Sequence, residues 1–348
     1  MPPPESHPPQ SSAPTARPSA ARRIGLVVNP TAGHGRGRRA GERTAQLLTA
    51  AGHDVIDLSA PTGALALTQA RDACSDGIDA LVVVGGDGMV HLGVNAVVAT
   101  RTPLGIVAVG SGNDFAAALG LPLHDTERAL STVCTALTTG TRCVDAVHVT
   151  APPPPTPITA PQQPPQKAPG PPTPRAPDPL TGTWYAGTLS VGIDAAINAT
   201  ANTYRWPSGH GRYLRAVLAC LRTFAPYGYR ITIDGTTRET LATLVAVSSA
   251  PRFGGGLRIA PDAQVDDGLL HVVHAGPLSR TSILRIFPGI YTGRHARHRA
   301  VTITHATSVT IEATTTGATP PVAFADGEPV GRVPLRADIH PGILHLLA

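Results

Sequence analysis

The sequence predicts an α/β fold in which a doubly wound parallel α/β domain is followed by a C-terminal antiparallel β-sandwich. Three observations predict it. Apolar runs alternate with helical patterns about every 25 to 30 residues in the first third of the chain. After residue 140 the apolar runs become short, threonine-rich and separated by turn signals. A length of 348 residues fits two domains, because one domain typically takes about 150 residues.

The elements of the first domain follow from its apolar periodicity. Residues 24–28 are an apolar run that stops at Asn29-Pro30, which indicates a buried strand ended by a turn. Glycines at positions 52 and 77 stand where left-handed helix caps are wanted. We expect further strands at 55–58, 80–84 and 104–109, and helices at 36–51, 64–76, 88–99 and 113–119.

The second domain is expected to be mostly antiparallel. Asp234-Gly235 separates two apolar runs and predicts a hairpin. One helix, at about 213–223, interrupts the strands, and a closing strand at 342–347 can belong to either domain. The strands are expected at 183–191, 229–233, 241–247, 268–274, 301–303, 309–311 and 322–325.

Two proline-rich tracts punctuate the chain. Residues 2–18 hold seven of the 36 prolines and residues 151–180 hold fourteen, so neither tract can bury much apolar surface. We therefore predict a disordered tail at 1–21, the α/β domain at 22–145 and the β-sandwich at 146–338, with an inserted loop at 151–180. A final strand, 339–348, can return to the first domain.

Composition excludes several classes of protein. We find no run of 18 apolar residues and no apolar segment near the start that resembles a signal peptide, so we expect a cytoplasmic protein. The four cysteines lack zinc-site or disulfide spacing. Aromatic residues are scarce and no nucleic-acid recognition motif occurs. The only lysine, Lys167, lies in a proline tract, so phosphate must be bound by backbone amides, arginine or a metal ion.

The turn after the third expected strand is the most informative segment. Gly85-Gly86-Asp87-Gly88 follows a buried run and opens a helix, so its amides and the positive helix end suit an anionic phosphate group. Lack of a Cβ permits close approach of the ligand to the backbone. Asp87 can orient a metal or a ribose hydroxyl. The alternative is an ordinary turn with aspartate as the helix N-cap.

Two more loops leave the same edge of the expected sheet. Gly110-Ser111-Gly112-Asn113-Asp114 follows the fourth strand, and Ser111 can donate to a phosphate oxygen, while Asn113 can cap the next helix. The loop at 29–37 follows the first strand. Arginines 36, 38, 39 and 43 near it can reach nucleotide phosphates, or can be solvated helix charges. Three such loops can meet at one site.

The ordered motifs resemble the diacylglycerol kinase catalytic family, in particular its bacterial lipid kinase branch. The resemblance spans about 22–348, outside the proline tracts. It is carried by Asn29-Pro30-Thr31-Ala32-Gly33, Gly85-Gly86-Asp87-Gly88, Gly110-Ser111-Gly112-Asn113-Asp114-Phe115-Ala116, Gly254-Gly255-Gly256, Asp266-Asp267-Gly268-Leu269-Leu270 and Asp326-Gly327-Glu328-Pro329. The glycine-aspartate-glycine element alone is shared with NAD kinases and phosphofructokinases, so the ordered set is the specific signal.

The resemblance implies transfer of the ATP γ-phosphate to a lipid hydroxyl, with Glu328 as the proton acceptor. It implies a largely structural Mg²⁺ site at Asp267 and the backbone carbonyls of Gln264 and Leu269, an oxygen-only set that suits this ion. Backbone donors and Mg²⁺ can serve phosphoryl transfer without lysine. The implied nucleotide contacts are Asn29, Ser59, Gly85, Gly86, Asp87, Gly88, Met89 and Ser111.

Two residues depart from the family pattern. Met89 stands where the family usually has threonine, and Leu92 where it usually has glutamate. A nucleotide-binding regulatory protein without catalysis is therefore the alternative from another class, and an NAD kinase is a third and less favoured one. The acceptor lipid stays open among diacylglycerol, sphingoid bases, prenols and related alcohols.

Basic residues also raise the question of partners. Arginines 285, 294, 297 and 299 form a cluster that favours an anionic membrane surface at the inner face of the membrane, or else a solvated loop. We expect a lipid substrate at such a surface and no nucleic acid. The oligomeric state stays open, with a homodimer among the candidates.

Overall fold

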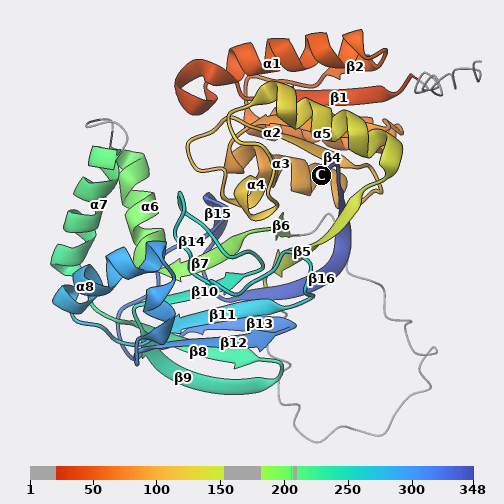
Figure 1. The fold of residues 1–348 in the computed structure, drawn as a ribbon. Helices are drawn as coiled ribbons and strands as arrows, with labels where there is room; N and C mark the ends of the chain where they lie inside the picture. Colours follow the sequence, from red (N-terminus) through yellow and green to blue (C-terminus); the bar gives the residue numbers. More distant parts are fainter. Residues whose placement is uncertain (1–20, 153–181, 205, 207–209) are drawn as a thin grey trace, which may run out of the picture.

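The computed structural model describes residues 21–152, 182–204, 206 and 210–348 (Figure 1). The predicted N-terminal tail and the inserted loop lie almost wholly outside these residues. Figure 1 shows an α/β layer stacked on a β-rich layer, with a group of helices at one end of the latter. No helix in the described part of the chain is long and apolar enough to cross a bilayer.

The first domain is built on a parallel sheet with the strand order β2-β1-β3-β4. Side chains alternate along the strands, so each strand feeds two apolar layers. Leu26 and Val82 pack toward α1 and α5, whereas Leu81 and Val83 pack toward α2 and α3. Its elements are β1 (Arg23–Val28), α1 (Ala32–Ala50), β2 (Asp54–Asp57), α2 (Gly63–Ser75), β3 (Ala80–Gly85), α3 (Asp87–Val97), β4 (Leu104–Ala108), α4 (Asp114–Ala118) and α5 (Thr126–Thr139).

The second domain is a sandwich of antiparallel strands. Its elements are β5 (Arg142–Thr150), β6 (Thr183–Tyr185), β7 (Thr188–Gly192), α6 (Ile193–Thr203), α7 (His210–Thr223), β8 (Tyr227–Ile233), β9 (Thr236–Ala242), β10 (Leu244–Ser248), β11 (Leu270–Ala275), α8 (Arg280–Tyr291), η1 (Arg294–Arg297), β12 (Val301–Ala306), β13 (Ser308–Ala313), β14 (Ala323–Ala325), β15 (Glu328–Gly331) and β16 (Leu335–Leu346). One sheet has the order β12-β11-β10-β7-β14-β15. Leu189 and Val247 of that sheet share an apolar core with Tyr229 and Ile311 of the other.

The last strand joins the two domains. β16 pairs antiparallel with β5 and β13, and its end pairs in parallel with β4 through Leu346 and Leu104. The parallel strands therefore belong to the same ten-stranded sheet as β8, β9 and β13. The predicted closing strand thus contacts both domains.

The fold class predicted from the sequence is confirmed, and so is the Asp234-Gly235 hairpin between β8 and β9. The expectation of a single helix in the second domain is wrong, because α6 and α8 are helices as well. Helix α5 and strand β5 were not expected either. Helix α8 contains Pro288, and a proline inside a segment argues against a helix. Five of the 14 residues of α5 are threonine, a β-branched residue that disfavours a helix. The predicted strand at 183–191 is split into β6 and β7.

Candidate active site

The glycine turns after β3 and β4 lie against each other. A Cβ built on Gly110 would lie 2.3 Å from Cα of Gly86, so position 110 requires glycine, and a Cβ on Gly86 would be tightly placed at 3.1 Å from Cα of Gly110. The amides of Val109 and Gly110 both donate to the carbonyl of Gly85, which fixes the two turns together. Helix α3 starts immediately after Gly86, so its first amides face the end of the sheet. This arrangement fits the predicted anion-binding edge.

The carboxylate of Asp87 is hydrogen-bonded to backbone amides of the neighbouring turn. Its carboxylate accepts hydrogen bonds from the amides of Asn113 and Asp114 at 2.8 and 2.7 Å, so it holds the start of α4. Burial and, to a lesser degree, the nearby carboxylates of Asp114 and Asp326 raise its pKa to about 6, although the amide hydrogen bonds act in the opposite direction. The sequence predicted either a ribose or metal contact for Asp87 or a cap of its own helix. Neither interpretation included this contact with the turn after β4.

The remaining predicted nucleotide contacts surround this edge. Oγ of Ser59 accepts a hydrogen bond from the amide of Val28 at 2.9 Å, and Oδ1 of Asn29 accepts one from the amide of Thr31 at 3.1 Å. Both side chains thus hold the ends of strands β1 and β2. Ser111 is exposed. Among Asn29, Ser59 and Ser111, only Ser111 is in the exposed class.

The residues that depart from the family pattern are buried. Met89 and Leu92 belong to the apolar core beneath α3 and are 9% and 7% exposed. A Cβ built on Gly85 would lie 2.3 Å from Cγ of Met89, so the methionine packs over the turn. Replacement of polar residues by these two apolar ones therefore extends the core and leaves the backbone amides of the turn in place.

Glu328 lies at the start of the same helix, although it comes from the other domain. Residues Asp326 and Gly327 have positive φ values of 50° and 87° and turn β14 back into β15. Glu328 follows this turn, and a Cβ built on Gly88 would lie 3.0 Å from its Oε1. The predicted proton acceptor and the predicted phosphate turn are therefore side by side.

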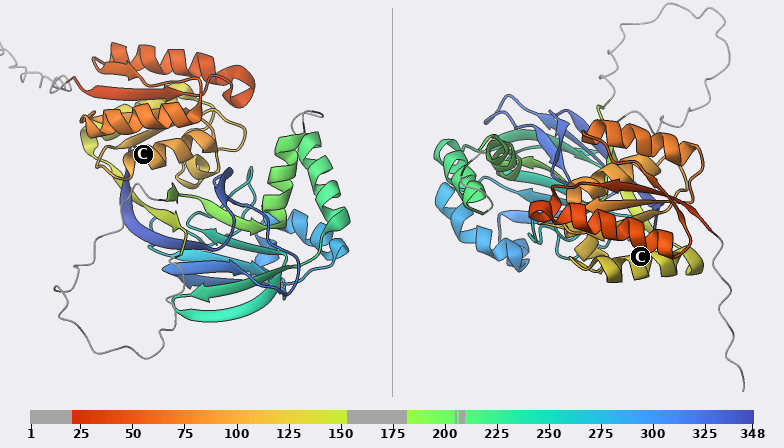
Figure 2. Two further views of the ribbon diagram at one scale, coloured as in Figure 1. Left: turned by 180° about the vertical axis from the view of Figure 1, so that it is seen from behind. Right: turned by 90° about the horizontal axis from the view of Figure 1, so that it is seen from above.

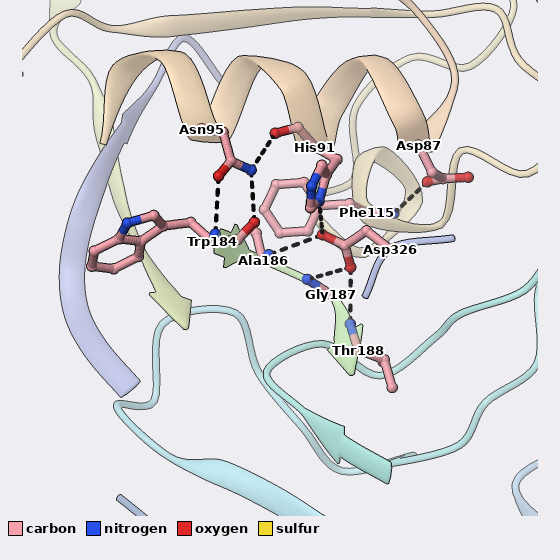
Figure 3. A network of polar contacts seen from close by, with 9 residues as sticks. All are labelled: Asp87, His91, Asn95, Phe115, Trp184, Ala186, Gly187, Thr188 and Asp326. Carbon is pink, nitrogen blue, oxygen red and sulfur yellow. Dashed lines mark hydrogen bonds and ion pairs between the residues drawn. The ribbon is translucent and has the colours of Figure 1, made fainter. Parts of the chain in front are cut away.

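Asp326 anchors the hairpin that carries Glu328 (Figure 3). Its carboxylate accepts hydrogen bonds from the amides of Ala186, Gly187 and Thr188, each at 3.0 Å. Nδ1 of His91, on α3, lies 4.0 Å from Oδ2 of Asp326. Asp326 is nearly buried, so a carboxylate there needs such partners. The hairpin is thereby fixed to the segment between β6 and β7.

A second contact ties α3 to the other domain. The side chain of Asn95 donates to the carbonyl of Trp184 at 2.8 Å and accepts from its amide at 3.0 Å. The side-chain amide of the buried Asn95 thus makes the same two hydrogen bonds to β6 that the backbone of a neighbouring strand would make. Because α3 begins at the glycine turn and Glu328 is held through residues 186–188, this contact helps to set the distance between the turn and the carboxylate.

Asp114 links the second glycine turn to the triple-glycine loop. Its carboxylate accepts hydrogen bonds from the amides of Gly255 and Gly256 at 2.6 and 2.7 Å. Burial raises the pKa of Asp114, while these amides act in the opposite direction. Both motifs are evident in the sequence, but their contact was not predicted. An acidic residue at a helix start and a run of glycines were the available signals, and neither specifies its partner.

The predicted magnesium residues form a hydrogen-bonded turn. The carboxylate of Asp267 accepts the amide hydrogens of Gln264 and Leu269 at 3.2 and 3.0 Å, and Nε2 of the buried His271 lies 3.0 Å from its Oδ2. Three nitrogen groups therefore surround the one carboxylate of the set. Within the described residues no cluster of three or more acidic, histidine or cysteine side chains can hold a metal. The carboxylate of Asp267 is thus already hydrogen-bonded within its own turn, and a magnesium site at these residues stays a prediction.

An arginine-lined cavity lies beside the loop after β1. Arg36, Arg39 and Arg43 line it together with His124 and Thr126, and its volume is about 210 Å³. Arg43 is paired with Glu127 at 2.6 Å, and Nε of Arg36 donates to the carbonyl of Gly33 at 2.9 Å. The cavity is also lined by Val109, which directly precedes the Gly110 turn. Of the four predicted arginines, three thus share a basic pocket next to the glycine turns.

Comparison with known proteins identifies the two domains separately. Residues 23–146 match the diacylglycerol kinase catalytic domain family, and residues 187–348 match the YegS C-terminal NAD kinase beta sandwich-like domain. A diacylglycerol kinase of Mycobacterium tuberculosis (strain ATCC 25618 / H37Rv) is 30% identical over 327 residues, which cover 93% of this chain and 94% of the relative. A diacylglycerol kinase of Bacillus subtilis (strain 168) is 23% identical over 298 residues, with 83% and 86% covered.

A solved structure agrees at the level of the fold. The crystal structure of a diacylglycerol kinase from Bacillus anthracis str. Sterne aligns with a TM-score of 0.62 and 19% identity over 94% of this chain and 97% of that chain. The fold and the site define a two-domain phosphotransferase. The chain belongs to the diacylglycerol kinase-like family of bacterial lipid kinases, and it is an ATP-dependent kinase of a lipid alcohol.

Proposed function

We propose that this lipid kinase transfers the γ-phosphate of ATP to the free hydroxyl of diacylglycerol. The proximity of Glu328 to the glycine turn at Gly88 supports this assignment most directly. Phosphoryl transfer requires positioning and charge stabilisation, and the attacking hydroxyl must lose a proton. A carboxylate beside a turn of amide donors meets both requirements. The relatives named diacylglycerol kinase support the choice of acceptor.

In this proposal each predicted residue has one task. The amides of the glycine turns hold the phosphates, and Ser111 donates to one of their oxygens. Glu328 accepts the proton of the lipid hydroxyl as that oxygen attacks the γ-phosphorus and ADP leaves. Asp326 positions Glu328 by holding its hairpin to the amides of residues 186–188. Dependence on Mg²⁺ and contact with the inner face of the membrane are further parts of the proposal.

The test is a transfer assay with radiolabelled ATP and dioleoylglycerol in mixed micelles. We expect phosphatidic acid as the product, and we expect Glu328→Gln to lower kcat by about a thousandfold, because general base catalysis contributes about 10² to 10⁴. Glu312→Gln removes a carboxylate on β13, away from the site, and should leave kcat unchanged. The assay is run with Mg²⁺ and again with EDTA.

Other outcomes of the same assay contradict the proposal. An unaffected Glu328→Gln variant would remove the assigned base. Nucleotide binding without transfer to any lipid would favour the regulatory alternative, and phosphorylation of sphingosine or a prenol but not of dioleoylglycerol would change the acceptor. Incubation with NAD checks the third alternative.

A further inference from the structure

Large apolar side chains are exposed mainly at one end of the second domain. Of the exposed large apolar residues in the described part of the chain, only Leu65 and Leu123 lie elsewhere. The others are Trp206 (77% exposed), Leu214 (59%), Leu218 (54%), Leu284 (50%) and Tyr291 (50%). They lie on α7, on α8 and just before α7. Figures 1 and 2 show these helices together at the edge of the β-rich layer.

The two helices are fixed to the protein by their inner faces. Ala216 and Leu221 of α7 share an apolar core with Ile193 and Ile197 of α6, and Ile283 of α8 packs against that core. Leu214 and Leu218 are four positions apart and therefore lie on one face of α7. Helix α8 has no buried residue at all. The exposed residues Leu214, Leu218 and Leu284 are therefore not part of this core.

The segments that carry these side chains are also strongly basic. Residues 210–225 and 279–300 contain no aspartate or glutamate. Arg222, Arg285, Arg294, Arg297 and Arg299 are exposed, and none of them is in an ion pair among the described residues. Neighbouring helices that expose leucines together with arginines lacking acidic partners have the pattern of a surface that enters the headgroup region of an anionic bilayer.

We propose that this α7–α8 face, formed by Leu214, Leu218, Leu284, Tyr291 and the five arginines, docks the kinase on an anionic membrane. The leucines insert below the headgroups, and the arginines contact lipid phosphates. The proposal rests on the proposed function, because a diacylglycerol acceptor resides in a bilayer. A second copy of the chain is a poor occupant, since a symmetric contact would place two basic faces against each other.

The test measures binding of the full chain to sucrose-loaded vesicles of phosphatidylcholine, with and without phosphatidylglycerol. We expect binding to the anionic vesicles that weakens with salt. Leu214→Ser with Leu218→Ser should weaken it by about tenfold or more, from the apolar burial lost. Leu65→Ser is the matched control, because Leu65 is 47% exposed on α2, away from this face. Gln at Arg294, Arg297 and Arg299 should abolish the preference for anionic vesicles.

Activity assays separate this inference from the proposed function. The Leu214→Ser, Leu218→Ser double variant should keep wild-type kcat on dioctanoylglycerol below its micelle concentration and lose activity on vesicle-embedded dioleoylglycerol, whereas Leu65→Ser should keep both activities. Vesicle binding without kinase activity on either lipid would overturn the proposed function alone. Unchanged vesicle binding of the double leucine variant would overturn the docking face. Loss of self-association in sedimentation, with vesicle binding intact, would instead identify a contact between copies and also overturn it.

Discussion

The turn that follows β3 and the hairpin β14–β15 meet at the start of α3, yet they contribute different chemistry. The turn offers backbone amides, and its close contact with the next turn depends on having no side chain at Gly110 and little room for one at Gly86. The hairpin offers one carboxylate, Glu328, whose place depends on the hydrogen bonds of Asp326. The first region therefore tolerates apolar replacements such as Met89, whereas the second depends on single polar atoms.

The sharpest way to break the first region is Gly110→Ala. Its Cβ would collide with Cα of Gly86 at 2.3 Å, and backbone on both sides must shift. We expect ATP affinity to fall by at least about tenfold and stability by about 2 kcal/mol, as in other overpacked sites. Titration with a fluorescent nucleotide and thermal unfolding measure the two effects. Gly63→Ala is the control, because a Cβ there meets no atom within 4 Å. Equal behaviour of both variants would contradict the role of the touching turns.

The second region is tested by Asp326→Asn. Asparagine has one acceptor oxygen for three amides, so the hairpin should loosen and Glu328 should move. We expect kcat to fall by about tenfold or more, while KM for ATP stays within about twofold. Steady-state kinetics separate the two constants. Asp234→Asn is a matched control, because Asp234 holds another Asp-Gly hairpin through the amides of Thr307 and Ser308. A rise in KM for ATP alone would argue against positioning.

The coupling between the two regions should appear as a pH effect at Asp87. Its folded pKa of about 6 lies above its usual value of 3.8, so between these pH values the folded protein binds more protons than the unfolded chain. Relative to Asp87→Asn, the wild type should therefore gain about 2 kcal/mol as the pH falls from 7 to 4, and lose it as the pH rises through 6. Urea unfolding at several pH values measures the difference. A constant difference would show that Asp87 has an ordinary pKa.

The smallest expected effect concerns the basic pocket beside the turns. Arg39 lines the cavity, and it has no acidic partner among the ion pairs of the described residues. If the pocket attracts nucleotide phosphate, Arg39→Ala should raise KM for ATP by about two- to threefold, because an exposed charge is screened. Arg38→Ala, outside the lining residues, is the control. An equal rise for both would indicate a general charge effect only.

Much of this architecture was predictable because it is local in the sequence. Strand periodicity and turn glycines predicted the parallel sheet, and the ordered motifs predicted that Glu328 and Gly88 belong to one site. The contacts that hold the site could not be predicted, since they join distant segments. Asp114 pairs with Gly255, 141 positions away, and Asp326 with Gly187, 139 positions away. The pairs Asp234-Gly235 and Asp326-Gly327 predict a turn equally well, so the sequence does not show that only the second lies at the site. Nothing in the sequence indicated the contact of His271 with Asp267.

The shared strand β16 has a mechanical consequence. The ladder between β5 and β16 resists sliding, because sliding would break a row of hydrogen bonds at once, whereas β4 of the first domain joins β16 through the one register pair of Leu346 and Leu104. Relative movement of the two domains should therefore be a rotation about the ladder of β5 and β16. The substrates would be enclosed by that rotation, not by the movement of a flexible linker.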